Sequence, residues 1–140
     1  MNRLSRFADP AYSIMRLIAG LLFATHGAQK VFGLFGGKVA AAPLMQFGGW
    51  VELVGGLLIA LGLFTRPAAF LSSGMMAVAY FMAHAGGGWH PVVNKGELAV
   101  VYCFLFLFVF FYGTGRLSLD ALIFRNRAGA GDTIGGPARV

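Results

Sequence analysis

The sequence contains few charged residues, and this scarcity decides its broad class. Asp, Glu, Lys and Arg make up only 11% of its 140 residues, whereas hydrophobic residues make up 58%. A soluble domain carries roughly 25% charged residues. So few charges cannot cover a surface that faces water, which excludes an ordinary soluble domain and indicates a single-domain integral membrane protein.

Cysteine is nearly absent as well. Cys103 is the only cysteine of the sequence, so no internal disulfide can form. Membrane enzymes that oxidise thiols exchange disulfides between pairs of cysteines, and the sequence argues against that class of function.

The sequence also lacks the patterns of nucleic-acid binders and of several enzyme classes. Its net charge is +6, but the basic residues stand singly between apolar runs, so we expect no nucleic-acid partner. It has no nucleophile-elbow serine and no glycine-rich loop after a strand, which argues against a hydrolase and against a nucleotide-binding protein.

Four long apolar segments are the main feature that is present. They cover about residues 11–33, 47–64, 67–85 and 96–113, and each approaches the ~20 residues that a spanning helix needs. We predict an all-α fold, an integral membrane four-helix bundle formed by residues 1–124, whose first span also acts as an uncleaved targeting signal. Residues 125–140 have little to bury, and we expect a disordered cytoplasmic tail.

The basic residues predict the orientation of this bundle. Four spans place both termini on one side, together with the link between the second and third spans. That side carries seven arginines, and the opposite side carries three lysines. By the positive-inside rule both termini are cytoplasmic, as expected for a multi-pass protein of the plasma (inner) membrane.

This orientation gathers nearly all ionisable side chains in or near the spans at the outer end of the bundle. His26, Lys30 and His84 come near the outer ends of the first and third spans. Glu52 and Glu97 come near the outer starts of the second and fourth. Ionisable groups inside a membrane are costly, so this layer is either a set of structural ion pairs or a chemical site.

Arg16 is the exception, because it falls near the cytoplasmic edge of the first span. A long basic side chain can reach from there to the interface. We predict a structural ion pair between Arg16 and Asp120, with Asp9 as a rival partner.

Helical spacing places small residues beside the polar ones on three of the four spans. The three sets are Arg16, Gly20, Phe23, Gly27 and Lys30; Gly48, Glu52, Gly55 and Gly56; and Ser73, Ala77, Tyr80 and His84. Small residues beside polar groups are typical of helix contacts in lipid, so we expect these faces to point inward. The phenylalanine-rich fourth span is expected to face mostly lipid, apart from Glu97.

Three kinds of ligand suit the histidines and glutamates of the outer layer. Metal and haem sites use these residue types, but no E-x-x-H or H-x-x-x-H spacing is present, which argues against both. A quinone headgroup is the third candidate, because His and Glu can exchange protons with it while an apolar cleft holds the ring.

Five motifs occur in order along the chain and carry a resemblance to a known family. They are R-L-x-x-G-L-L-F-x-x-H-G-x-x-K at 16–30, W-V-E-L-V-G-G at 50–56, L-G-L-F-T-R at 61–66, N-K-G-E at 94–97 and G-x-G-R-L-S-L-D at 113–120. In these motifs the chain resembles the DoxX family of small four-helix membrane proteins. The resemblance implies a plasma-membrane bundle, and for some relatives a role in thiosulfate:quinone oxidoreductases or in oxidative-stress systems.

We therefore predict a small membrane subunit of a quinone-linked or oxidative-stress redox system, with a redox protein as partner. In this hypothesis His26 and Glu52 exchange protons, Lys30 sets their charge state or holds an anionic substrate, and Glu97 completes the site. Tyr80 and His84 would line the quinone pocket. The alternative is a non-enzymatic scaffold, assembly factor or small-solute carrier with structural buried charges, so the sequence leaves open whether the protein is an enzyme.

Overall fold

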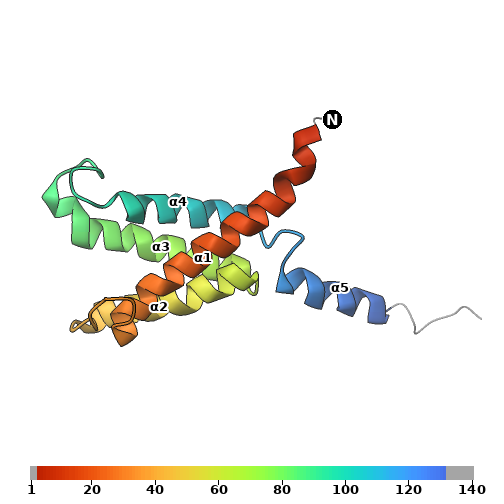
Figure 1. Ribbon diagram of the computed structural model, residues 1–140, viewed down its shortest axis with the longest axis horizontal. Helices are drawn as coiled ribbons and strands as arrows, with labels where there is room; N and C mark the ends of the chain where they lie inside the picture. Colours follow the sequence, from red (N-terminus) through yellow and green to blue (C-terminus); the bar gives the residue numbers. More distant parts are fainter. Residues whose placement is uncertain (1–2, 132–140) are drawn as a thin grey trace, which may run out of the picture.

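The computed structural model describes residues 3–131, with side chains up to residue 125, and in this part of the chain all regular secondary structure is helical, without strands. Its α-helices are α1 (Ala8–Phe32), α2 (Pro43–Leu61), α3 (Thr65–Ala79), α4 (Glu97–Tyr112) and α5 (Leu119–Gly131) (Figure 1). A 3-10 turn, Arg3–Phe7, precedes α1. A π-helical turn, Tyr80–His84, and a short 3-10 turn, Ala85–Gly87, continue α3.

The expected all-α membrane fold is confirmed, with three helical stretches long and apolar enough to cross a bilayer. They are Arg3–Phe32, Pro43–Leu61 and Thr65–Gly87. The fourth apolar helix, α4, has 16 residues. At ~1.5 Å per residue it is about 24 Å long, less than the ~30 Å hydrocarbon core. Its crossing of the membrane therefore stays a prediction.

Helix α5 was not expected as a separate element. It begins after Ser118, whose Oγ accepts a hydrogen bond from the backbone N–H of Ala121 at 3.1 Å. A serine in this position is a common helix N-cap. The helix continues to Gly131, past the start of the tail predicted at residue 125, and residues 132–140 of that tail lie outside the described residues.

The backbones of α1 and α2 touch at glycines. A Cβ atom added to Gly20 would lie 2.6 Å from the carbonyl oxygen of Gly56, and one added to Gly56 would lie 2.6 Å from that of Gly20. Lipid provides no hydrophobic drive for helices to associate, so close backbone packing of this kind stabilises the pair. The inward faces predicted for α1 and α2 are confirmed, because every glycine in them is buried.

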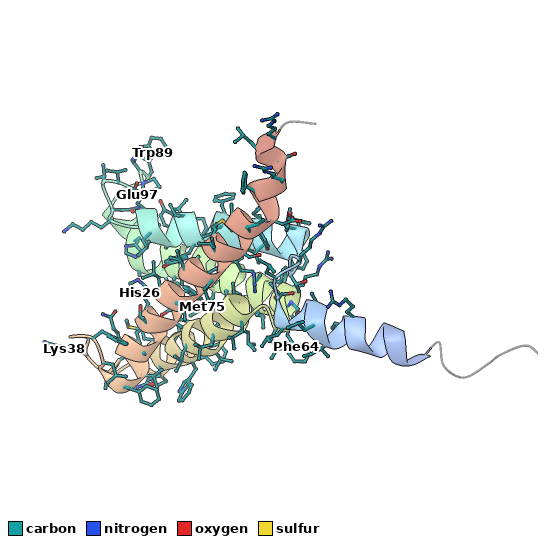
Figure 2. All side chains as sticks on the ribbon, turned by 45° about the vertical axis from the view of Figure 1, so that its right-hand side comes forward. His26, Lys38, Phe64, Met75, Trp89 and Glu97 are labelled. Carbon is teal, nitrogen blue, oxygen red and sulfur yellow. The ribbon has the colours of Figure 1, made fainter. Side chains whose placement is uncertain are left out.

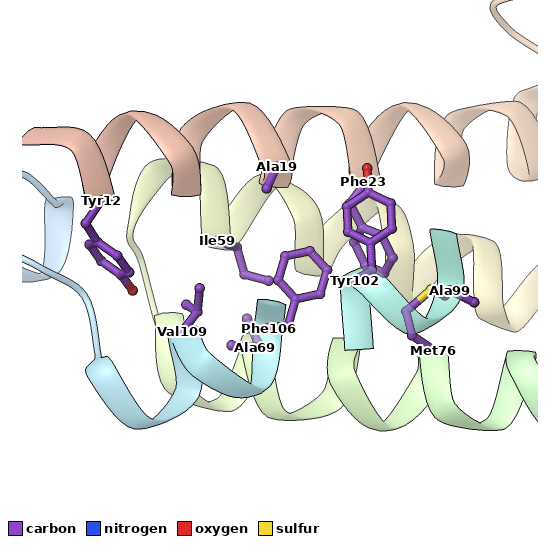
Figure 3. Close-up of a cluster of buried hydrophobic side chains, with 11 residues drawn as sticks. Tyr12, Ala19, Phe23, Ile59, Ala69, Met76, Ala99, Tyr102, Phe106 and Val109 are labelled. Atoms are coloured by element: carbon purple, nitrogen blue, oxygen red, sulfur yellow. The ribbon is translucent and has the colours of Figure 1, made fainter. Parts of the chain in front are cut away.

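Aromatic rings fill the space between these two helices and α4 (Figure 3). The ring centroid of Phe23 lies 4.8 Å from that of Phe106 and 5.2 Å from that of Tyr102. Such tilted ring pairs stabilise by about 0.5–1.5 kcal/mol beyond their buried area. The expectation that α4 faces mostly lipid is therefore wrong for Phe106, which is fully buried, although Phe104, Phe108 and Phe111 are exposed.

The two ends of the bundle differ in their connections. Figure 1 shows the N-terminal end of α1, the short link between α2 and α3, and α5 toward one end, which we call the turn end. Both long connections, residues 33–42 and 88–96, lie at the opposite end, which we call the loop end. Figure 2 shows the same division, with Lys38 and Trp89 far from Phe64.

Candidate functional site

A cavity of about 230 Å³ opens at the loop end, and we call it the loop-end pocket. All four helices α1–α4, the π-helical turn and the connection before α4 contribute to its wall. The lining residues are Phe23, His26, Lys30, Glu52, Met76, Ala79, His84, Lys95, Leu98, Ala99 and Tyr102. An apolar cavity with a few convergent polar groups is the usual form of a small-ligand site.

An ion pair between α1 and α2 forms one wall of this pocket. Lys30 Nζ lies 2.5 Å from Glu52 Oε1, and the Glu52 side chain is only 2% exposed while that of Lys30 is 33% exposed. Close helix packing makes the pair possible: a Cβ atom added to Gly49 would lie 2.8 Å from Lys30 Cβ. Larger residues at this crossing would separate the helices and the two charges.

The second carboxylate oxygen of Glu52 has no such partner. Glu52 Oε2 is buried, and no hydrogen-bond donor reaches it among the residues that the structure describes. A buried carboxylate oxygen is costly when it is left without a donor. This atom therefore marks a place where a ligand with a hydrogen-bond donor would be stabilised.

The two histidines of the pocket have different surroundings. The ring of His26 packs edge-on against Tyr102, with 6.3 Å between centroids. His84 Nδ1 lies 3.2 Å from the carbonyl oxygen of Asn94. His84 stands at the end of the π-helical turn, a kind of irregularity that is frequent at functional sites.

Asn94 organises the loop that carries these groups, and its role was missed in the sequence. Its Nδ2 donates to Gly88 O at 2.8 Å and to Tyr80 Oη at 3.0 Å, and its Oδ1 accepts from Gly96 N at 2.8 Å. The only signal was its place in the motif N-K-G-E. The loop is thereby held against the end of α3, with His84 beside it.

The structure brings together four of the six residues predicted to form the site. His26, Lys30, Glu52 and His84 all line the loop-end pocket. The two residues outside its lining are Glu97, which is exposed in the first turn of α4, and Tyr80, whose hydroxyl donates to Trp89 O at 3.2 Å.

Two lining residues, Lys95 and Tyr102, were missed. Tyr102 belongs to the buried face of α4, which repeats at Ala99, Tyr102 and Phe106. That i, i+3, i+7 spacing is present in the sequence, but it does not stand out because α4 is hydrophobic on all its faces. Among residues 3–125, no group of three or more His, Cys, Asp or Glu side chains lies close enough to hold a metal ion.

The turn end holds a second polar cluster, built around Arg16, which is 3% exposed. Its Nη1 donates to Ile59 O at 2.6 Å and its Nη2 donates to Leu117 O at 2.8 Å. The predicted ion pair with Asp120 is not formed, because the guanidinium donates to these two backbone carbonyls instead. Arg16 therefore joins α1 to α2 and to the segment before α5.

Asp120 also binds backbone rather than a side chain. Its Oδ1 accepts from Phe64 N at 3.2 Å and its Oδ2 from Thr65 N at 3.4 Å. These N–H groups begin α3, where a helix leaves its first donors unpaired and favours a negative charge. Asp120 thus caps the N-terminus of α3 from a distant part of the chain.

Asp9, the rival partner proposed for Arg16, belongs to the same cluster but pairs elsewhere. Its Oδ2 lies 3.1 Å from Arg116 Nε, and its Oδ1 accepts from Tyr112 Oη at 3.0 Å. Tyr12 Oη donates to Gly113 O at 2.6 Å. The turn-end cluster thereby ties the start of α1 to the end of α4.

A groove of about 530 Å³ lies beside Arg16 and is larger than the loop-end pocket. Leucines and Ile14 form most of its wall, and its polar members are Ser13, Arg16, Arg116 and Ser118. Both Nη atoms of Arg16 donate to backbone carbonyls, whereas its Nε is buried without a partner among the described residues. A groove with such a wall is better suited to binding an apolar hydrocarbon chain than to catalysing a reaction. The loop-end pocket is therefore the candidate functional site.

Comparison with known proteins agrees with this architecture. An uncharacterized protein of Haemophilus influenzae is 38% identical over 133 residues, which cover 89% of this chain and 99% of that protein. A second uncharacterized protein of the same organism is 33% identical over 72 residues, covering 51% of this chain and 48% of that protein. No solved structure matches the chain.

The family comparison covers the helices that carry most of the site. The DoxX family matches residues 11–85, a range that includes His26, Lys30, Glu52 and His84. Together with the apolar spanning helices, this match identifies a multi-pass membrane protein. The chain belongs to the DoxX family.

Proposed function

We propose that this protein is a small membrane subunit of a quinone-linked redox system, with its quinone site in the loop-end pocket. The observation that carries the proposal is the meeting of His26, Lys30, Glu52 and His84 around one cavity between α1–α4. Ionisable residues at membrane depth are costly and commonly mark functional sites, and here they converge on one space.

The walls of the pocket suit a single aromatic ring. Phe23 and Tyr102 supply aromatic faces, Met76 supplies a soft apolar contact, and the volume of about 230 Å³ is small for a drug-sized ligand. The buried oxygen of Glu52 offers a polar contact to a substituent on that ring. A quinone bound here would supply two-electron, two-proton redox chemistry.

The side chains of this chain would bind and manage protons. His26 and Glu52 are the proposed proton-exchanging pair, and Lys30 holds Glu52 in position through the ion pair. His84 is a proposed ligand-binding residue. Tyr80 acts by holding the loop, and Glu97 is left out of the proposal because it is exposed and does not line the pocket.

Quinone binding is testable on the purified full chain in lipid nanodiscs. We expect a short-tailed benzoquinone to bind saturably with one site per chain, as measured by calorimetry. His26→Ala should weaken that binding by up to about 10-fold, the effect of one lost hydrogen bond. The matched control Glu97→Gln should bind as the unmodified chain does, and a lack of saturable binding by the unmodified chain would overturn the proposal.

The membrane topology is a second part of the proposal. We propose four spans formed by residues 1–124 in the plasma membrane, with α4 as the short fourth span and both termini in the cytoplasm. The exposed arginines at the turn end and the lysines at the loop end support this orientation by the positive-inside rule.

Reporter fusions test this topology directly. A reporter that is active only outside the cytoplasm should be active when fused after Lys38 and inactive when fused at the C-terminus. The same compartment for both fusions would contradict the four-span arrangement.

One observation favours a non-enzymatic function as the second candidate. The Lys30–Glu52 pair joins α1 to α2 as a structural ion pair would, which suits a scaffold, an assembly factor or a small-solute carrier. In that case exchanging the two charges would restore stability together with function, whereas a quinone site would be disturbed by the exchange.

A further inference from the structure

The free oxygen of Glu52 limits which ligand the loop-end pocket can hold. Because Oε1 lies 2.5 Å from the ammonium of Lys30, Glu52 is a carboxylate, and a carboxylate only accepts hydrogen bonds. Oε2 is buried and has no donor within the described part of the chain. The ligand atom next to Oε2 must therefore be a hydrogen-bond donor if the site is to be satisfied.

His84 provides a second acceptor in the same pocket. The carbonyl oxygen of Asn94 can only accept, so the His84 Nδ1 that lies 3.2 Å from it carries the hydrogen. In the neutral ring Nε2 then holds a lone pair and accepts. Glu52 and His84 thus line the same cavity as acceptors, from α2 and from the end of the π-helical turn after α3.

The two redox forms of a quinone differ in this respect. The oxidised ring presents two carbonyl oxygens, which are acceptors, whereas the reduced ring presents two hydroxyl groups, which donate. A carbonyl oxygen beside Glu52 Oε2 would place two acceptors together, while a hydroxyl group would pair with it.

We propose that the loop-end pocket binds the hydroquinone form in preference to the quinone form, and that Glu52 Oε2 accepts a hydrogen bond from one ring hydroxyl. This inference rests on the proposed quinone function and names the redox form that the site selects. Lys30 contributes by holding the carboxylate in position through the ion pair.

Three ligands separate the alternatives on the unmodified full chain. A short-tailed benzoquinone, its hydroquinone and the dimethyl ether of that hydroquinone are titrated by calorimetry into nanodiscs under anaerobic conditions. We expect the hydroquinone to bind about 10-fold more tightly than the quinone, from one hydrogen bond to a charged acceptor. The dimethyl ether has the same ring but no donor, so it should bind no better than the quinone.

Glu52→Gln tests the named atom. In this variant the amide oxygen would remain toward Lys30, so the NH₂ group would replace the free acceptor with a donor, and the preference for hydroquinone should vanish or invert. Glu97→Gln removes an exposed carboxylate outside the pocket and should keep the preference. A Glu52→Gln protein that still prefers hydroquinone 10-fold would show that Glu52 does not select the redox form.

The outcomes distinguish this inference from the proposed function. If none of the three ligands binds, the quinone function itself is wrong. If quinone and hydroquinone bind equally, or quinone binds more tightly, the function stands and the selection by Glu52 is wrong. The ligand comparison on the unmodified chain decides this even if Glu52→Gln fails to fold.

Discussion

The two ends of the bundle use buried polar side chains in opposite ways. At the turn end, Arg16 donates to two backbone carbonyls, and Asp120 accepts from two N–H groups at the start of α3. At the loop end, Lys30 and Glu52 bind each other, and one oxygen of Glu52 faces no donor within residues 3–125.

This difference distinguishes buried polar side chains that stabilise the fold of a membrane protein from those that are available to bind a ligand. A side chain that completes backbone hydrogen bonds at helix ends removes a cost that lipid cannot relieve. An unpaired buried atom alone does not mark a binding site, because Arg16 Nε at the turn end also lacks a partner among the described residues. At the loop end the unpaired oxygen of Glu52 belongs to a cavity that His26, Lys30 and His84 also line. We therefore propose a role in folding for the turn end and a role in ligand binding for the loop-end pocket.

The largest effect on stability should come from Arg16. Arg16→Met removes two hydrogen bonds from a charged donor, each worth about 1.5–3 kcal/mol, so we expect unfolding to become easier by about 4 kcal/mol. Unfolding by sodium dodecyl sulfate in mixed micelles, followed by far-UV circular dichroism, measures the change.

A neighbouring arginine provides the control for this experiment. Arg116 pairs with Asp9, but its side chain is 87% exposed, so Arg116→Met should cost no more than about 1 kcal/mol. Equal losses for the two variants would remove the distinction between a buried clamp and a surface ion pair.

The contrast between the two ends was only partly predictable from the sequence. Periodicity and small residues placed Gly20, Gly27 and Glu52 on inward faces, because a polar residue among glycines has one favourable side in lipid. The predicted partner of Arg16 was wrong. Asp120 was the acidic residue expected on the same side of the membrane, whereas the backbone carbonyls that Arg16 binds cannot be recognised in a sequence. The local signal for α5, a serine followed by a helical segment, was present but was not used.

The site shows the same limit. Lys30 and Glu52 could be brought together by helix direction and spacing alone. Glu97 was assigned by depth in the membrane, which does not distinguish the pocket side of a helix from its other faces. Tyr80 was assigned by regular helical spacing, but it begins a π-helical turn, where that spacing does not hold. Asn94 was missed, since hydrogen bonds that fold a loop depend on geometry that has no periodicity.

The next effect in size concerns the Lys30–Glu52 pair. Lys30→Met should destabilise by about 3 kcal/mol, since it leaves a buried carboxylate unpaired while a third of the Lys30 side chain is exposed. The exchange variant, Lys30→Glu with Glu52→Lys, should recover most of that stability but not quinone binding. Recovery of both in the same unfolding and calorimetry measurements would make the loop end structural, like the turn end.

The smallest expected effect concerns the cap of α3. Asp120→Asn keeps one acceptor for the N–H groups of Phe64 and Thr65 but removes the negative charge at the helix start. We expect a loss of about 1 kcal/mol in the free energy of unfolding and unchanged ligand binding. A change in ligand affinity with unchanged stability would show that the turn end influences the loop-end pocket. It would contradict the proposal that the two ends have separate roles in folding and in binding.

Photo-crosslinking measures most directly where a ligand binds. A benzoquinone carrying a photoreactive azide is bound to the full chain in nanodiscs and irradiated, and the labelled peptides are identified by mass spectrometry. We predict label on the peptides that contain His26 and His84, removed by excess unlabelled ligand. Competed label beside Arg16, in the larger apolar groove of the turn end, would contradict the assignment of the loop-end pocket as the binding site.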